Sequence, residues 1–129
     1  MDLKFKKEER LAHKTEIKNL LRRGNKIRLF PFVVFYSKSR EKDEPHPIPL
    51  KIAISIPKRT FKKAVDRNLL KRRCREAYRI NRMPLKEKML QNQTSLSFIF
   101  IYKAKTSLSY SEIEDKIILI LRRLQEVHE

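Results

Sequence analysis

Apolar residues recur along the chain with two different periods. Ile17, Leu20 and Leu21 fall at i, i+3 and i+4, which predicts one face of a helix that follows Thr15. Gly24 comes directly after two arginines and is the only glycine of the chain. Because cations and then a glycine are typical of a helix C-terminus, we expect Gly24 to be a left-handed C′ cap.

Three segments rich in aromatic and β-branched residues predict strands. They cover residues 29–37, 50–56 and 95–102. Segment 29–37 is apolar on both of its alternating faces. We therefore expect both faces to be covered by other elements or used for binding. A break at Pro31 would divide it into two strands and raise the strand count. Pro57 ends the second segment, because proline cannot donate a hydrogen bond to a sheet.

Two further helices are predicted downstream. The first runs from Lys62 or Lys63 to Asn81, and the Met-Pro pair that follows closes it. The second opens at Ser109, where Glu112 three positions later completes a capping box. The apolar residues of this second helix keep helical spacing. They are Ile113, Ile117, Ile120, Leu121 and Leu124.

Polar segments join these elements. Residues 38–49 hold three prolines and predict a long loop, and residues 85–94 predict a connector with at most a short helical turn. The element order is then α-β-β-(β)-α-β-α over residues 1–129. This order predicts one α+β domain, a small two-layer sandwich with helices packed on a mainly antiparallel sheet.

The net charge indicates the function more clearly than the predicted fold does. The chain carries 32 Lys and Arg against 15 Asp and Glu, a net charge of +17. Such an excess favours an acidic partner, with nucleic acid ahead of an anionic membrane surface. The lone Cys74 builds neither a disulfide nor a metal site and fits a reducing cytosol. With no long apolar run and no apolar signal segment, we expect a cytoplasmic protein.

The basic residues concentrate in segment 58–82, which holds eleven Lys or Arg and two acids. At about 100° per residue, one arc of its helix gathers cations and an amide. That arc is Arg67, Asn68, Lys71, Arg72, Arg75, Arg79 and Arg82. The opposite side, expected to dock on the sheet, is Leu69, Leu70, Cys74, Ala77 and Ile80. Like charges at i,i+4 disfavour an isolated helix, so the pattern indicates a binding face. Arg73 does not fit this pattern, because it projects toward the apolar side of the helix.

The stretch KIAISIPKRTFKKAVDRNLLKRRCREAYR, residues 51–79, resembles the protein subunit of bacterial ribonuclease P. The matching positions are Ala64-Val65, Arg67-Asn68, Lys71-Arg72 and Arg75. The resemblance extends to Arg10-Leu11, to the helix before Gly24 and to the segment from Tyr102-Lys103 to Tyr110. Leu69 stands where the family usually has arginine, which puts one RNA contact in doubt.

The resemblance implies both a fold and a function. The fold would contain a left-handed βαβ crossover and match the second domain of a small-subunit ribosomal protein. The function would be to help a catalytic RNA remove the 5′ leader from precursor tRNA, as a monomer bound one to one. The RNA subunit would perform the hydrolysis and carry Mg²⁺, and the protein alone would bind no cofactor.

The resemblance also implies two groups of site residues. Those expected to bind the catalytic RNA are Lys62, Lys63, Arg67, Asn68, Lys71, Arg72, Arg75 and Arg79. Those expected to bind the leader and the tRNA are Arg10, Ile17, Leu21, Phe35, Lys58, Arg59 and Lys103. For Ile17, Leu21 and Phe35, a plain role in the core is an equally good interpretation.

The sequence offers no catalytic or metal site of its own. His13, His46 and His128 are scattered, and no carboxylates gather at two-metal spacing. An autonomous nuclease is therefore disfavoured, as is a membrane-surface helix, since strands flank the basic helix. The remaining alternative is a ribosomal or other structural RNA-binding protein, which the ordered signature alone separates from the ribonuclease P subunit.

Overall fold

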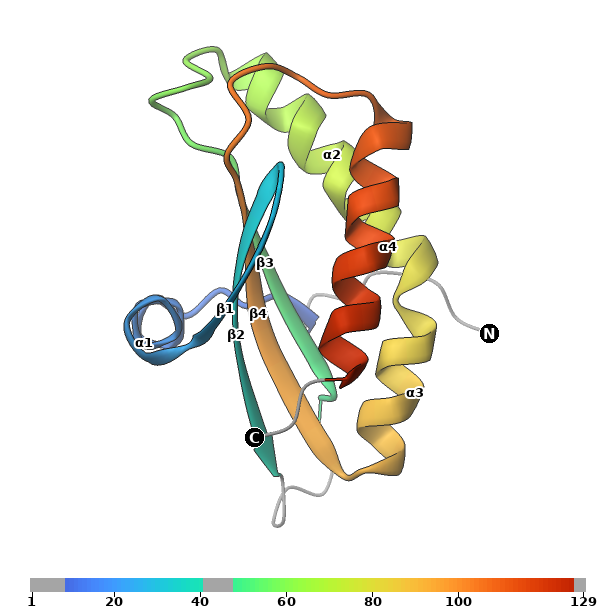
Figure 1. Ribbon diagram of the computed structural model, residues 1–129. Helices are drawn as coiled ribbons and strands as arrows, with labels where there is room; N and C mark the ends of the chain where they lie inside the picture. Colours follow the sequence, from blue (N-terminus) through green and yellow to red (C-terminus); the bar gives the residue numbers. More distant parts are fainter. Residues whose placement is uncertain (1–8, 41–47, 127–129) are drawn as a thin grey trace.

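The structure, a computed structural model, describes residues 9–40 and 48–126 (Figure 1). Within them it confirms the α+β class. The elements are α1 (Lys14–Arg23), β1 (Asn25–Leu29), β2 (Phe32–Arg40), β3 (Leu50–Ser55), α2 (Ala64–Asn81), α3 (Met83–Gln91), β4 (Thr94–Tyr102) and α4 (Tyr110–Glu126).

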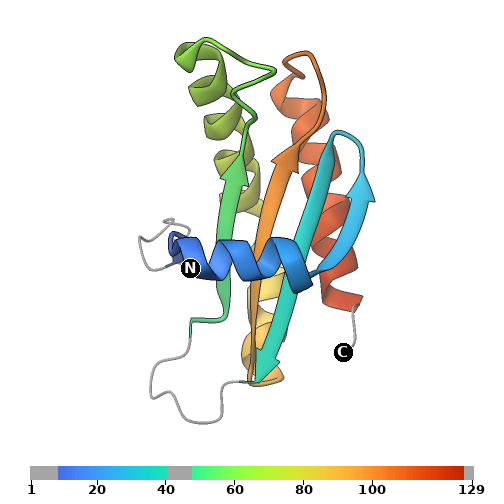
Figure 2. The same ribbon diagram turned by 90° about the vertical axis from the view of Figure 1, so that its left-hand side faces the viewer.

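The four strands form one mixed sheet in the order β1-β2-β4-β3. The pairs β1–β2 and β2–β4 are antiparallel, and β3–β4 is parallel. Helices α2, α3 and α4 cover one face, and α1 crosses the other (Figures 1 and 2). In Figure 2, β3 and β4 point upward with β4 to the right, and their connection through α2 passes behind the sheet. This crossover is therefore left-handed, against the usual preference.

The core explains why the strands are apolar on both faces. Phe98, Phe100 and Tyr102 alternate along β4 and are fully buried toward α2, α3 and α4. Between them, Ile99 faces the opposite way and joins a small cluster under α1 that contains Leu11 and Leu20. Because both faces of β4 are covered, its sequence has little polar alternation there.

The predicted strand 29–37 is two strands, as a break at Pro31 would require. Residues Phe30 and Pro31 form the turn, and β1 begins at Asn25, before the predicted start. Ile27 of β1 pairs with Val34 of β2 and is buried with it. The start of β1 was missed because polar residues flank Ile27 on a solvent-facing edge.

The prediction for Gly24 is wrong. Its backbone is extended, with φ −69° and ψ 155°, and not left-handed. Its N–H donates to the Leu20 carbonyl oxygen at 2.8 Å, which draws the chain tightly against the end of α1. A Cβ atom at this position would collide with that oxygen and lie 3.2 Å from the Tyr36 carbonyl oxygen. Glycine is therefore required by close approach, a use distinct from positive φ.

The connector predicted over 85–94 is wrong as well, since residues 83–91 form helix α3. Pro84 lies in its first turn, where its missing N–H costs no hydrogen bond. Leu85 and Met89, one helical turn apart, are completely buried. Only two apolar positions face the core, so the periodic signal was short and the surrounding lysines and glutamate suggested a loop.

The remaining predictions on the elements have different outcomes. The predicted helix cap at Ser109 is confirmed, because its Oγ accepts from the Glu112 N–H at 3.2 Å, and the Glu112 carboxylate accepts from the Ser109 hydroxyl at 3.0 Å. The predicted start of the loop 38–49 is wrong, because residues 38–40 pair with β4 as the end of β2. Residues 41–47 lie outside the described part of the chain. Among the residues that the structure describes, no helix has the length and apolarity that a membrane span requires.

Candidate RNA interface

Helix α2 docks on the sheet and on α4 through a narrow apolar stripe. Leu70, Cys74, Ala77 and Tyr78 are completely buried. Burial disfavours charge, and it raises the pKa of the Cys74 thiol to about 12. A stripe this narrow leaves most of the circumference of α2 available for other contacts.

The outer side of α2 forms a cationic surface, which we call the α2 face. Its residues line a cavity of about 470 Å³ together with Arg10 from the N-terminal segment. The lining residues are Arg10, Asn68, Lys71, Arg72, Arg75, Glu76 and Arg79. Asn68, Arg72 and Arg75 are exposed, whereas Lys71 and Arg79 are half-buried. The structure thus brings together five of the eight residues predicted to bind the catalytic RNA.

One acid interrupts the α2 face. Arg79 donates from Nη2 to Glu76 Oε1 at 2.6 Å and from Nε to Glu76 Oε2 at 3.1 Å. These hydrogen bonds favour the carboxylate and hold the pKa of Glu76 below its usual range. Sequence reasoning missed Glu76, although its spacing of three residues from Arg79 is a signal for an ion pair.

The other three predicted residues lie at the start of α2. Lys62 and Lys63 are exposed, and Lys63 is the N-cap residue. Arg67 Nη1 donates to the carbonyl oxygens of Phe61 at 2.7 Å and Lys62 at 3.0 Å. The Arg67 guanidinium therefore fixes the turn that carries both lysines.

Arg73 on α2 and Arg82 directly after it make contacts that the helical wheel did not predict. Arg82 was expected on the cationic arc, but its side chain is completely buried and its Nε lies 3.3 Å from Glu9 Oε2. Arg73 donates from Nη1 to the Leu108 carbonyl oxygen. Leu69 and Ile80, expected to dock, are 38% and 43% exposed. The burial stripe is narrower than predicted and centred on Leu70, Cys74, Ala77 and Tyr78 because α4 packs along it.

A second cavity, of about 440 Å³, lies between α1, the N-terminal segment and β3, and we call it the apolar cleft. Its lining is Arg10, Leu11, Ala12, Ile17, Ile52, Ala53, Ile54, Ser55, Ile56, Lys71, Arg75 and Ile99. Ile17 is half-buried and packs against the cluster of Leu11, Leu20 and Ile99. Ile17 thus lines the cleft and also contacts the apolar cluster between α1 and the sheet.

The other residues predicted to bind the leader do not line this cleft. Leu21 is 42% exposed. Phe35 is half-buried, and Lys26 Nζ lies 5.0 Å from its ring centroid, in cation–π range. Lys58 and Arg59 follow the end of β3, and Lys103 follows the end of β4. Because β3 and β4 are parallel neighbours, all three exposed cations lie at one edge of the sheet.

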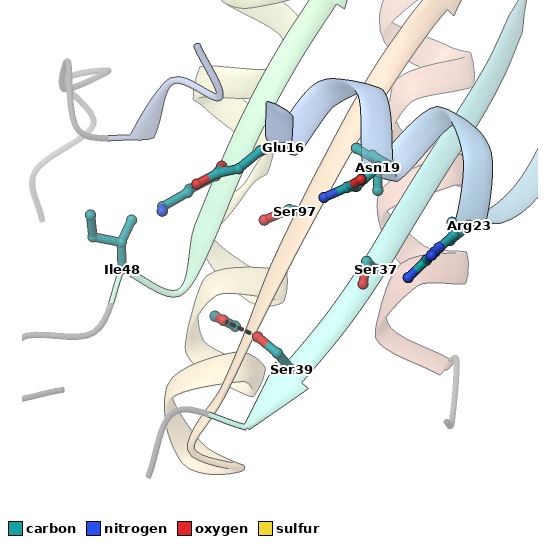
Figure 3. A pocket seen from close by; sticks show the side chains of 11 residues that line it. Glu16, Asn19, Arg23, Ser37, Ser39, Ile48 and Ser97 are labelled. Carbon is teal, nitrogen blue, oxygen red and sulfur yellow. Dashed lines mark hydrogen bonds between the residues drawn. The ribbon is translucent and has the colours of Figure 1, made fainter. Parts of the chain in front are cut away.

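A third cavity, of about 410 Å³, lies on the other side of α1 (Figure 3). Four serines from two paired strands form its floor, with Ser37 opposite Ser97 and Ser39 opposite Ser95. The Ser39 and Ser95 hydroxyls are 2.9 Å apart. Asn19 and Arg23 reach toward the floor from α1. Sequence reasoning missed this polar half of the sheet, although serine at alternate positions of two strands is its signal.

Candidate metal ligands do not gather within residues 9–40 and 48–126. No three His, Cys, Asp or Glu side chains there come close enough to hold a metal ion. His13 is exposed and precedes α1. The two other histidines lie outside the described residues.

Comparison with known proteins gives a consistent result. The family model described as Ribonuclease P matches residues 5–125. The ribonuclease P protein component of Petrotoga mobilis is 32% identical over 128 residues, covering 94% of this chain and 95% of that protein. That of Dictyoglomus turgidum is 42% identical over 84 residues, covering 64% of each.

Solved structures support the fold. The ribonuclease P protein of Thermotoga maritima superposes with a TM-score of 0.66 at 22% identity, covering 89% of this chain and 96% of that one. The protein of Staphylococcus aureus superposes with a TM-score of 0.66 at 20% identity, covering 89% and 94%. At such identities the likeness concerns the arrangement of helices and strands.

Proposed function

The chain belongs to the ribonuclease P protein family, and we propose that it binds the catalytic RNA of that enzyme through the α2 face. The observation that supports this proposal most strongly is the gathering of Arg10, Lys71, Arg72, Arg75 and Arg79 around one cavity. Arginine suits this role because its planar guanidinium donates in pairs to phosphate oxygens. Lys62 and Lys63 extend the surface toward the preceding turn.

We propose further that the 5′ leader of precursor tRNA lies in the apolar cleft and on the adjacent sheet. Ile17 and Leu21 offer aliphatic contact, and Phe35 offers an aromatic ring on which a base can stack. Lys58, Arg59 and Lys103 would hold leader phosphates at the strand ends. A single strand suits this surface, because its unstacked bases can reach an apolar floor.

In this proposal the RNA subunit hydrolyses the phosphodiester bond and carries Mg²⁺, and one protein binds one RNA. The protein contributes positive charge where RNA strands approach one another. A net charge of +17 neutralises phosphates that would otherwise need counterions. The chain would therefore lower the magnesium concentration that the catalytic RNA requires.

The test of the α2 face is a paired substitution with a charge-matched control. The double variant Arg72→Ala with Arg75→Ala removes two exposed cations from the face. Its control, Arg122→Ala with Arg123→Ala, removes two exposed cations from α4. We expect the α2 variant to bind catalytic RNA more weakly, with a salt slope smaller in magnitude by about 1.5, which corresponds to two lost phosphate contacts. Equal effects of the two variants would refute the α2 face as the RNA site.

A further inference from the structure

The N-terminal segment is held to the fold by a buried carboxylate. Glu9 is 5% exposed, and its Oε2 lies 3.3 Å from Nε of Arg82, which is completely buried. Its Oε1 lies 3.7 Å from Lys86 Nζ on α3. Burying a carboxylate is costly unless cations compensate it, and here two cations do. Glu9 is therefore tied to the end of α2 and the start of α3.

The next residues add a short stretch of pairing to the sheet edge. Arg10 forms a parallel bridge with Ile52 of β3. The Leu11 N–H donates to the Ile52 carbonyl oxygen at 2.8 Å, and the Leu11 side chain is buried under α1. The chain is thus fixed immediately before Arg10, by an ion pair, and immediately after it, by a backbone hydrogen bond and apolar packing.

Arg10 lies where the two cavities meet. Its exposed side chain lines the cavity of the α2 face and also the apolar cleft. Lys71 and Arg75 line both cavities as well, so the two surfaces share one cationic border. Of these three residues, Arg10 alone lies outside the helices and strands, so its position depends on the contacts of Glu9 and Leu11.

We infer that Glu9 is a positioning residue, which holds Arg10 at this border to bind a phosphate of an RNA strand that passes from the α2 face into the apolar cleft. The inference rests on the proposed function. A long arginine side chain on an unanchored segment loses conformational entropy when it binds. The Glu9–Arg82 ion pair removes part of that cost before RNA arrives. Buried ion pairs often add little stability. In this inference the Glu9–Arg82 pair serves to position Arg10.

A double-mutant cycle tests this inference. The affinity for catalytic RNA is measured for the unchanged chain, Glu9→Gln, Arg10→Ala and the double variant. We expect Arg10→Ala to weaken binding about tenfold in the unchanged chain, as the loss of a charged hydrogen bond would. In the Glu9→Gln background we expect a loss of about twofold or less. Glu87→Gln, at an exposed position of α3, is the control for the change in charge.

Amide hydrogen exchange provides a second readout. A general loss of stability would not change the exchange of one amide selectively, whereas a loss of positioning would. In Glu9→Gln, the Leu11 N–H should exchange faster, while the Phe98 N–H in the central strand β4 keeps its rate. Should Glu9→Gln fail to fold, Glu9→Asp, which keeps the charge on a shorter side chain, enters the same cycle with the same expectation.

Two outcomes would overturn the inference. One is an equal cost of Arg10→Ala with and without Glu9, and the other is unchanged exchange at Leu11. Failure of the proposed function looks different, because Arg72→Ala with Arg75→Ala would then leave the affinity for catalytic RNA unchanged. The two proposals can thus fail separately.

Discussion

Arg79 and Glu76, one turn apart on α2, form a paired hydrogen-bonded contact of 2.6 and 3.1 Å on the surface that otherwise collects cations. The pair orients the Arg79 guanidinium along the helix and places a carboxylate beside the proposed phosphate path. Because Glu76 is partly exposed, the contact adds little to stability. Its main consequence is electrostatic, since it lowers the positive potential of the α2 face.

Glu76→Gln should therefore tighten RNA binding. The substitution removes one negative charge from the α2 face and keeps the shape of the side chain. We expect about threefold higher affinity for catalytic RNA at low salt, falling toward no effect as salt screens the charge. Filter binding over a salt series measures this. Asp115→Asn, at an exposed position of α4, should have a smaller effect, and an equal effect would contradict a local cause.

Phe35→Leu should weaken the contact with a single-stranded leader. Leucine preserves apolar volume on the sheet but removes the ring on which a base can stack. Stacking on an aromatic side chain contributes about 1–3 kcal/mol per base, so a loss of about tenfold is expected for precursor tRNA that carries a leader. Mature tRNA should bind as before. Phe30→Leu, at the exposed turn between β1 and β2, is the matched control. A similar loss in both variants would exclude a specific platform at Phe35.

Met89→Ala tests the helix that sequence reasoning missed. Met89 is completely buried against the sheet, and truncating it should destabilise the fold by about 2–5 kcal/mol. Leu90→Ala changes the neighbouring residue, which is 51% exposed, and should cost about 0.5 kcal/mol or less. Urea unfolding of both variants provides the comparison. If the two variants unfold at the same midpoint, α3 does not pack as described.

The Cys74 thiol should be unreactive in the folded protein. Burial raises the pKa of Cys74 from 9.0 to about 12, so thiolate is scarce below that pH. Since the folded pKa lies above the unfolded one, the stability linked to this group is complete below pH 9 and is lost as pH rises toward 12. Alkylation by iodoacetamide at pH 8 should be slow in buffer and fast in urea. Equal rates in both would show that the thiol is not buried.

The sequence predicted the elements whose periodicity is long and unbroken. Helices α2 and α4, with clear apolar spacing and a capping box, were placed to within two residues at the ends that the patterns mark. Helix α3 was missed because only Leu85 and Met89 mark its buried face. The handedness of the β3–α2–β4 crossover came from the family resemblance, because local pattern carries no information on it.

The residues of the candidate site also fall into those that the sequence predicted and those that it did not. Lys71, Arg72 and Arg75 could be placed on one surface from helical geometry alone. The burial of Arg82 could not, because its partner Glu9 is more than seventy positions away in the chain. Gly24 shows a related limit, since its close approach to Leu20 and Tyr36 depends on how α1 lies over the sheet. Pairings distant in sequence are set by packing, which a local pattern does not record.

The most direct measurement is cleavage of precursor tRNA by a bacterial ribonuclease P RNA at low magnesium, with and without this chain. We expect little cleavage by the RNA alone, efficient removal of the 5′ leader when the chain is added, and a clearly reduced rescue by Arg72→Ala with Arg75→Ala. The α4 control variant, Arg122→Ala with Arg123→Ala, should rescue almost fully. Absence of rescue at any protein concentration, or cleavage by the chain without RNA, would contradict the proposed function.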